Sequence, residues 1–165
     1  DGVINDENLG EYILHWDHFI FSKGVLDVFK KLSDVFGRII IITNQKGVGK
    51  GLMTQEALDT IHYEMQREVE LVGGRIDKIY FCTDLDDNSP TRKPNAGMAL
   101  QAQKDLPEID FSKSIMIGNK PSDMRFGRNA GMFTVFVAST NPEQAFPDTD
   151  IDLRFDSLFQ FAAAL

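Results

Sequence analysis

The sequence predicts an α/β fold: a doubly wound parallel sheet with helices on both faces. Short runs of consecutive apolar residues alternate along the chain with longer segments whose apolar residues recur at helical spacing. Unbroken β-branched runs are typical of parallel strands, because helices cover both of their faces. Polar residues directly follow several of these runs, and open parallel sheets bind their ligands at this end of the strands.

The first half of the chain contains two clear helix patterns and one clear strand. Residues 24–36 carry apolar side chains at helical spacing, and Gly37 supplies a plausible end for that helix. The run 38–42 is almost entirely isoleucine and predicts a buried strand. Thr54 is a favourable N-cap for a second helix, which the glycines at 73–74 end.

The same alternation continues to the end of the chain. The remaining strands are expected at residues 76–81, 114–117, 133–137 and 151–155, and the remaining helices at residues 94–104, 122–129 and 157–165. A chain of 165 residues is long enough for one core and too short for two, so we expect a single domain over residues 1–165. Because Asp1-Gly2 reads as the turn after a strand, a first strand is expected upstream of Asp1.

Charge and cysteine content exclude several classes of protein. The net charge of −8 argues against a general nucleic-acid binder, which needs a positive surface to displace counterions. A small anionic ligand stays compatible with this charge if cations gather locally. Cys82 is the only cysteine, so an intramolecular disulfide is excluded and a cytosolic location is expected. No apolar run has the length of a membrane span, and no membrane partner is expected.

Four polar segments stand at predicted strand ends or turns. They are Asp1-Gly2-Val3-Ile4-Asn5, Thr43-Asn44-Gln45, Arg92-Lys93-Pro94 and Gly118-Asn119-Lys120-Pro121-Ser122-Asp123. Together they offer carboxylates, a hydroxyl, amides and cations, which suit a phosphate and a hard divalent metal. Each segment alone also fits an ordinary turn, cap or solvated ion pair. Their convergence at one edge of the predicted sheet favours a phosphoryl-transfer site.

In this order the four segments resemble the motifs of the haloacid dehalogenase superfamily, over nearly the whole chain. The closest likeness is to its small branch of heptose bisphosphate phosphatases and histidinol phosphatases. The resemblance implies a Rossmann-type three-layer sandwich. The short spacing between the motifs implies the absence of a large cap domain.

The resemblance also implies roles for individual residues. Asp1 matches the general acid and base, and the nucleophilic aspartate of the family lies two positions before it, outside this sequence. Thr43 would hydrogen-bond the transferring phosphoryl group, and Lys93 would neutralise its charge.

The neighbouring positions are expected to bind substrate. Asn44 and Gln45 would shape the phosphate and substrate pocket, and Lys120 is the expected lysine of the fourth motif. Arg92 would meet the substrate directly. A guanidinium fork beside a lysine suits a phosphorylated sugar.

Mg²⁺ is the cofactor that the resemblance implies, with Asp1, Asn119 and Asp123 as its expected ligands. The family usually has an acid where this chain has Asn119, so the site loses one formal negative charge. A second departure is the segment 82–90, where relatives often carry Cys and His zinc ligands. It contains one cysteine and no histidine, so no structural zinc is expected.

The leading hypothesis is a monomeric, Mg²⁺-dependent phosphatase that acts on a small phosphorylated metabolite through an aspartyl phosphate. A sugar phosphate or bisphosphate is the first substrate class, and histidinol phosphate is the second. One alternative is a catalytically weak or inert protein that binds a phosphorylated ligand, which Asn119 and the absent nucleophile favour. The weakest alternative is a nucleic-acid 3′-phosphatase, because the chain is acidic.

Other features carry less information. The glycines at 47–51 suggest a flexible connector, and this segment fails the P-loop pattern. The spacing of His15 and His18 is weak evidence for a metal site without further ligands, and an exposed loop or strand edge is the favoured interpretation. Tyr12 and Trp16 are expected at the substrate entrance, because their segment directly follows the first motif.

Overall fold

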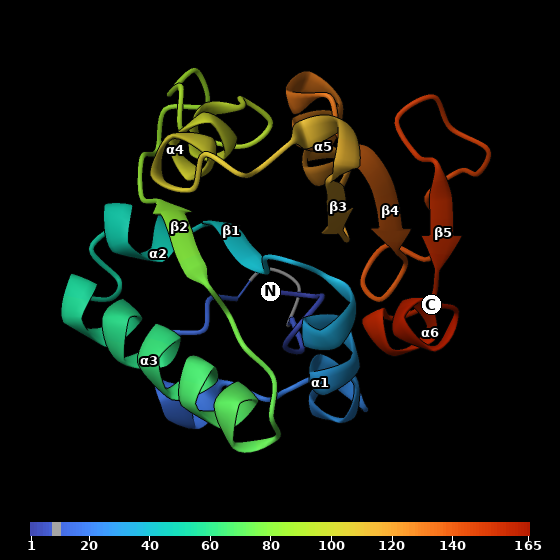
Figure 1. Ribbon diagram of the computed structural model, residues 1–165. Helices are drawn as coiled ribbons and strands as arrows, with labels where there is room; N and C mark the ends of the chain where they lie inside the picture. The colour runs from blue at the N-terminus through green and yellow to red at the C-terminus, as the bar shows by residue number, and fades with distance from the viewer. Residues whose placement is uncertain (8–10) are drawn as a thin grey trace.

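The computed structural model describes residues 1–7 and 11–165 and contains two parallel sheets. The strands are β1 (Ile40–Asn44), β2 (Lys78–Cys82), β3 (Ile115–Gly118), β4 (Phe133–Val137) and β5 (Leu153–Phe155). β1 pairs with β2, whereas β4 lies between β3 and β5. Every one of these pairings is parallel. The predicted α/β class with parallel strands is therefore confirmed (Figure 1).

The helices occupy the segments between the strands. They are α1 (Val25–Val35), α2 (Lys46–Gly49), α3 (Gln55–Leu71), α4 (Gly97–Asp105), α5 (Pro121–Ala130) and α6 (Leu158–Ala163), with short 3₁₀ turns η1 (Trp16–His18) and η2 (Phe111–Lys113). The hydroxyl of Thr54 accepts a hydrogen bond from Ala57 N–H and caps α3, as predicted. The suggested flexible connector after Gln45 instead begins with one helical turn, α2.

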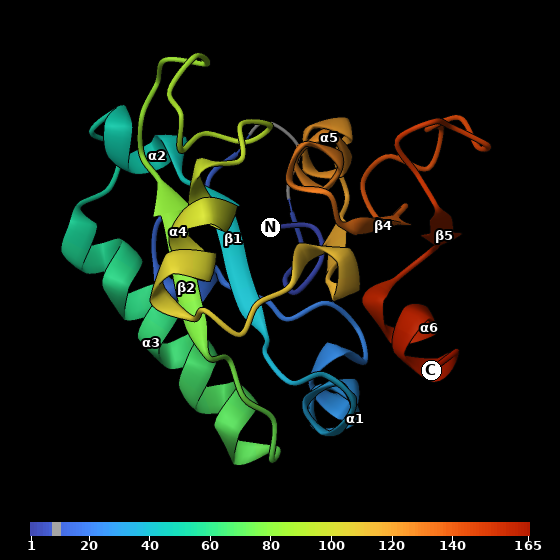
Figure 2. The same cartoon turned by 45° about the horizontal axis from the view of Figure 1, so that its top comes forward.

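Alternating residues of the strands pack into two different cores, one on each face. Ile41 and Ile117 contact the core that contains buried side chains of α1, α3 and α6. Ile40, Ile42 and Met116 belong to the core formed with α4 and α5. Figures 1 and 2 show α1 and α3 on one side of the strands and α4 and α5 on the other. Because both faces are covered, consecutive positions in the strands must be apolar, and this explains the unbroken isoleucine run.

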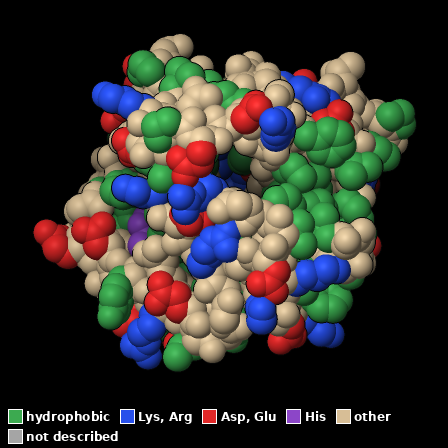
Figure 3. Space-filling view, viewed as in Figure 1, with side chains coloured by type: hydrophobic (Ala, Val, Ile, Leu, Met, Phe, Trp, Pro, Cys, Tyr) green, Lys and Arg blue, Asp and Glu red, His purple; other side chains and the backbone are tan. Residues whose placement is uncertain are grey.

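A cavity of about 800 Å³ separates the two sheets. Ile40, Ile41 and Ile42 of β1 line it, together with Ile115 and Ile117 of β3. The amino-terminal residue of the chain lies between β1 and β3 (Figure 1), and a hollow opens in this region of the surface (Figure 3). The strand expected upstream of Asp1 stays a prediction.

On the face shown in Figure 3, Lys, Arg, Asp and Glu side chains are scattered, and hydrophobic side chains gather on one side. Figure 3 shows hydrophobic side chains over β4 and β5, where Phe133 and Leu153 are exposed. None of the described helices is long and apolar enough to cross a membrane.

Candidate active site

A second cavity, of about 440 Å³, gathers the predicted site residues. It is lined by Asp1, Thr43, Asn44, Gln45, Arg92, Lys93, Asn119, Lys120 and Asp123. These residues come from the amino-terminal turn, the carboxyl end of β1, the loop after β2 and the turn between β3 and α5. The fold therefore brings together four segments that lie far apart in the sequence.

Lys93 and Asp123 form a largely buried ion pair in the wall of this cavity. Lys93 Nζ lies 2.7 Å from Asp123 Oδ1, and their side chains are 11% and 6% exposed. The same ammonium group donates a hydrogen bond of 3.0 Å to the carbonyl of Ile42 in β1. These contacts fix the position of the ammonium group at the end of the sheet.

The carboxylate of Asp123 is held from a second direction as well. Its Oδ2 accepts hydrogen bonds from the backbone N–H groups of Asn119 and Lys120, at 3.2 and 3.1 Å. These bonds satisfy donors at the start of α5, where a negative charge is also favourable. Burial acts to raise the pKa of Asp123, but the charge of Lys93 and the hydrogen bonds outweigh it, so this pKa is lowered.

Asn44 connects β1 to the loop that carries Lys93. Asn44 Nδ2 donates to the Lys93 carbonyl at 3.2 Å, and Asn44 Oδ1 accepts from Lys93 N–H at 3.1 Å. Beside it, Gln45 Nε2 donates to Thr43 Oγ1 at 3.0 Å. The Thr43 hydroxyl hydrogen therefore remains available to a ligand in the cavity.

Asp1 and Gly2 form a tight turn at the edge of the cavity. Asp1 Oδ1 accepts a hydrogen bond of 2.9 Å from Asn5, which is buried. Gly2 has a φ of +77°, and a Cβ at this position would lie 2.0 Å from Asn119 Nδ2. Glycine therefore allows the turn to approach the β3–α5 segment closely.

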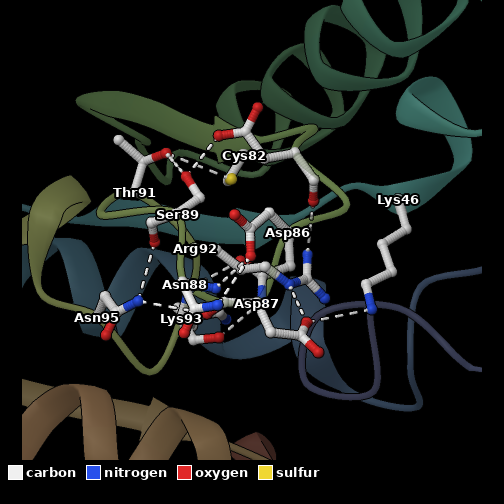
Figure 4. Close-up of polar contacts among 12 residues, drawn as sticks. Lys46, Cys82, Asp86, Asp87, Asn88, Ser89, Thr91, Arg92, Lys93 and Asn95 are labelled. Atoms are coloured by element: carbon white, nitrogen blue, oxygen red, sulfur yellow. Dashed lines mark hydrogen bonds and ion pairs between the residues drawn. The ribbon is translucent and has the colours of Figure 1, made fainter.

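Arg92 is held by the loop after β2 (Figure 4). Its Nε donates to Asp87 Oδ1 at 2.9 Å, and one terminal nitrogen donates to the Asp84 carbonyl at 3.2 Å. Lys46 Nζ lies 3.4 Å from the same Asp87 oxygen. The hydrogen bond from Arg92 and then the charge of Lys46 lower the pKa of Asp87. Arg92 and Lys46 thus form a second cationic group at the cavity.

Polar contacts within this loop hold its shape (Figure 4). Thr91 Oγ1 donates to Cys82 Sγ at 3.3 Å, and Asn95 Nδ2 donates to the Ser89 carbonyl at 2.9 Å. Asn88 N–H donates to Asp86 Oδ1 at 2.9 Å. Cys82 is buried within this network. The absence of a structural zinc stays a prediction.

Sequence reasoning missed several residues of the cavity. Glu7, Glu11, Lys46 and Asp87 also line it. Lys46 directly follows the Thr43-Asn44-Gln45 segment, which was a usable signal. Glu7 and Asp87 approach only because loops fold back over the strand ends, so no local pattern identified them.

The two aromatic residues expected at the entrance have different positions. Tyr12 lines the cavity, as predicted. Trp16 does not line it; its ring stacks on Phe19 with centroids 5.0 Å apart and also meets Phe21. The prediction for Trp16 was wrong, because aromatic and apolar packing between η1 and the core draws its side chain inward.

The amino-acid sequence of the chain is similar to that of known proteins. Residues 90–153 match the family model described as HAD-hydrolase-like. A D-glycero-alpha-D-manno-heptose-1,7-bisphosphate 7-phosphatase of Mycobacterium bovis is 32% identical over 166 residues, which cover 100% of this chain and 87% of that protein. The chain belongs to the haloacid dehalogenase superfamily of phosphatases. A D-glycero-beta-D-manno-heptose-1,7-bisphosphate 7-phosphatase of Yersinia pestis is also 32% identical to this phosphatase, over 100% of the chain and 91% of that protein.

Solved structures agree with this membership. A D,D-heptose 1,7-bisphosphate phosphatase of B. bronchiseptica, complexed with magnesium and phosphate, superposes with a TM-score of 0.89 at 24% identity. The match covers 99% of this phosphatase and 93% of that chain, and it supports the shared fold. A D,D-heptose 1,7-bisphosphate phosphatase of Burkholderia thailandensis has a TM-score of 0.69 at 26% identity, over 99% and 92% of the chains.

Proposed function

We propose that this phosphatase removes one phosphate from a small sugar bisphosphate, with a heptose 1,7-bisphosphate as the leading substrate and its 7-phosphate as the reacting group. The convergence of Asp1, Thr43, Lys93 and Asn119 on one cavity carries the proposal. Relatives named for this reaction at 32% identity support the substrate class. The names of these relatives specify different anomers of the heptose, alpha and beta, so the proposal includes both anomers. We also propose that the protein is a monomer and that it is located in the cytosol.

The cations of the cavity suit a substrate with two anionic groups. The Lys93 side chain is 11% exposed and lines the same cavity as Thr43 and Asp1, where a fixed positive charge would stabilise a reacting phosphoryl group. Arg92 and Lys46 form a second cationic group, joined through Asp87. A guanidinium group binds phosphate oxygens in a fork, so this second group would hold the phosphate that is retained.

The residues present suit Mg²⁺ as the cofactor. Asp1, Asn119 and Asp123 offer hard oxygen donors, and no His or Cys lines the smaller cavity among the described residues. Within residues 1–7 and 11–165, no three His, Cys, Asp or Glu side chains are arranged to hold a metal. The oxygen donors of Asp1, Asn119 and Asp123 are the support for Mg²⁺, because Mg²⁺ prefers oxygen ligands, keeps several waters and takes few protein ligands.

Asp123 differs from the other two expected ligands. Both of its carboxylate oxygens already accept contacts, from Lys93 and from the backbone at the start of α5. We therefore propose that Asp123 mainly orients Lys93 and this backbone, and that oxygens of Asp1 and Asn119 would hold the cation. When bound, Mg²⁺ would offset negative charge on the phosphoryl oxygens.

The proposed chemistry divides the remaining work among a few residues. In the family pattern the nucleophilic carboxylate lies two positions before Asp1, and its attack on phosphorus would give an aspartyl phosphate. Asp1 would donate a proton to the departing sugar oxygen and later take one from the attacking water. Thr43 Oγ would donate to a phosphoryl oxygen, while Lys93 offsets the charge of the transferring group.

The test is a substrate panel with the natural full-length protein and Mg²⁺. We expect phosphate release from heptose 1,7-bisphosphate with a kcat/KM at least about tenfold above that for histidinol phosphate, because a second phosphate adds an ionic contact. A preference for histidinol phosphate, or for a 3′-phosphorylated oligonucleotide, would overturn the substrate class.

One observation favours a second function, that of a ligand-binding protein without turnover. Asn119 stands where an acid is usual, so the site has one negative charge fewer to hold a cation. Tight binding of the bisphosphate that does not respond to Mg²⁺ and gives no product would support this alternative.

A further inference from the structure

The side-chain amide of Asn119 is held by two acceptors. Asn119 Nδ2 donates to Glu7 Oε2 at 3.1 Å and to Thr140 Oγ1 at 2.6 Å. A carboxamide nitrogen carries two hydrogens, so both donors are used. Asn119 is 2% exposed, and its backbone is fixed as well, because its carbonyl accepts from Asn141 Nδ2 at 2.7 Å. The amide group therefore has one defined position.

Glu7 also fixes the orientation of the Asn119 side-chain amide. If the amide turned over, Asn119 Oδ1 would lie about 3 Å from a carboxylate oxygen, and two acceptors at that distance repel each other. In the observed orientation Oδ1 accepts no hydrogen bond from any described residue. Asn119 lines both cavities together with Asp1 and Asp123. The contact with Glu7 thus leaves Oδ1, the side-chain carbonyl oxygen of Asn119, available to a ligand.

Glu7 brings a negative charge to the same place. Its Oε1 lies 2.5 Å from Lys120 Nζ, while Oε2 accepts from Asn119, so each carboxylate oxygen has its own partner. The Glu7 side chain is only 13% exposed. Although position 119 is neutral, a carboxylate lies within hydrogen-bond distance of it, supplied by a segment 112 residues earlier.

We propose that Glu7, with Thr140, is a positioning residue that presents the Asn119 carbonyl oxygen to the divalent cation and supplies the negative charge that position 119 lacks. This inference rests on the proposed function, since the cation belongs to that site. The Glu7 carboxylate and the Asn119 carboxamide form a matched pair, which would take the place of the single acid that is usual at position 119.

The matched pair predicts a specific pattern of coupling. In Asn119→Asp the new carboxylate faces Glu7, and like charges at about 3 Å destabilise the fold. In Glu7→Gln the amide still faces Asn119 but the negative charge is lost. The double variant E7Q/N119D restores one carboxylate and one carboxamide with their positions exchanged. It therefore restores both the hydrogen bond and the charge.

The experiment measures thermal stability without metal, and Mn²⁺ binding from the electron paramagnetic resonance signal of the free ion. We expect Asn119→Asp to lower the Tm by about 3–6 °C, and the double variant to recover most of this loss. Glu7→Gln should weaken Mn²⁺ binding about tenfold, and the double variant should restore it. Glu143→Gln, at an exposed carboxylate away from the cavity, serves as the control and should change neither quantity.

Two results would overturn the inference, for different reasons. Additive Tm changes, together with Mn²⁺ binding that Glu7→Gln does not alter, would contradict the role of Glu7 and leave the proposed cofactor intact. Non-additive Tm changes in a protein that binds no Mn²⁺ would instead contradict the proposed divalent cation. They would also contradict the role of Glu7 and Asn119 in holding that cation.

Discussion

Lys93 Nζ and Asp123 Oδ1 lie 2.7 Å apart in side chains that are almost completely buried. The pair joins the loop after β2 to the start of α5, across the carboxyl ends of two separate sheets. Because a buried charge without its partner is costly, this contact should matter for stability as well as for phosphate binding.

Asp123→Asn leaves the Lys93 ammonium group buried beside a neutral amide. We expect a loss of about 3–5 kcal/mol in the free energy of unfolding, measured with urea. The double variant K93M/D123N should lose clearly less than the sum of the two single variants, since neither charge remains. Strict additivity would show that the two residues do not interact.

Gly2→Ala tests the close approach of the first turn to Asn119. The new Cβ would lie 2.0 Å from Asn119 Nδ2, and the backbone has a φ of +77°. Gly131→Ala is a matched control, because Gly131 has a φ of +82° and no atom within 4 Å of a Cβ. Denaturant unfolding should show a loss of about 1–2 kcal/mol for the control and at least about 1 kcal/mol more for Gly2→Ala. Equal losses would mean that only the backbone conformation matters.

His62 predicts a dependence of stability on pH. Burial lowers the pKa of His62 to about 4, and the nearby charge of Asp59 opposes this only partly. Because the folded pKa lies below the unfolded value of about 6.5, the unfolded chain takes up the proton first as pH falls. The free energy of unfolding should therefore decrease between pH 6.5 and 4, by on the order of 2 kcal/mol from this residue. His62→Gln should flatten that part of the profile, and an unchanged slope would contradict the assignment.

Arg92→Lys separates substrate binding from chemistry. The Arg92 side chain is 10% exposed and is anchored by Asp87 next to the cavity. Loss of the guanidinium fork should raise the KM for a bisphosphate substrate about tenfold and change kcat by less than about threefold. Arg67→Lys on the surface of α3 is the control. If kcat falls as much as kcat/KM does, Arg92 acts on the transition state instead.

The strands and the site segments were predictable because their signals are local. The isoleucine run before Thr43 and the apolar run before Asn119 must be covered on both faces, and the polar residues that follow must lie at the strand ends. One cavity then follows from the parallel arrangement of the strands.

The rest depends on contacts between distant segments, which sequence spacing does not encode. Glu7 reaches Asn119 and Lys120 only through the path of the first turn, and Asp87 reaches Lys46 only through the loop after β2. Trp16 was placed at the entrance from sequence proximity, but packing against Phe19 decides its position.

The proposed function requires that this cavity remove phosphate from a sugar bisphosphate. The direct measurement is phosphate release from heptose 1,7-bisphosphate by the natural full-length protein with Mg²⁺, compared with Thr43→Val and with Thr60→Val, an exposed threonine of α3. We predict turnover that Thr60→Val leaves unchanged and that Thr43→Val lowers about 10²-fold, through the lost hydrogen bond to the phosphoryl group. Equal turnover by all three proteins, or none by the wild-type protein, would contradict the proposed function.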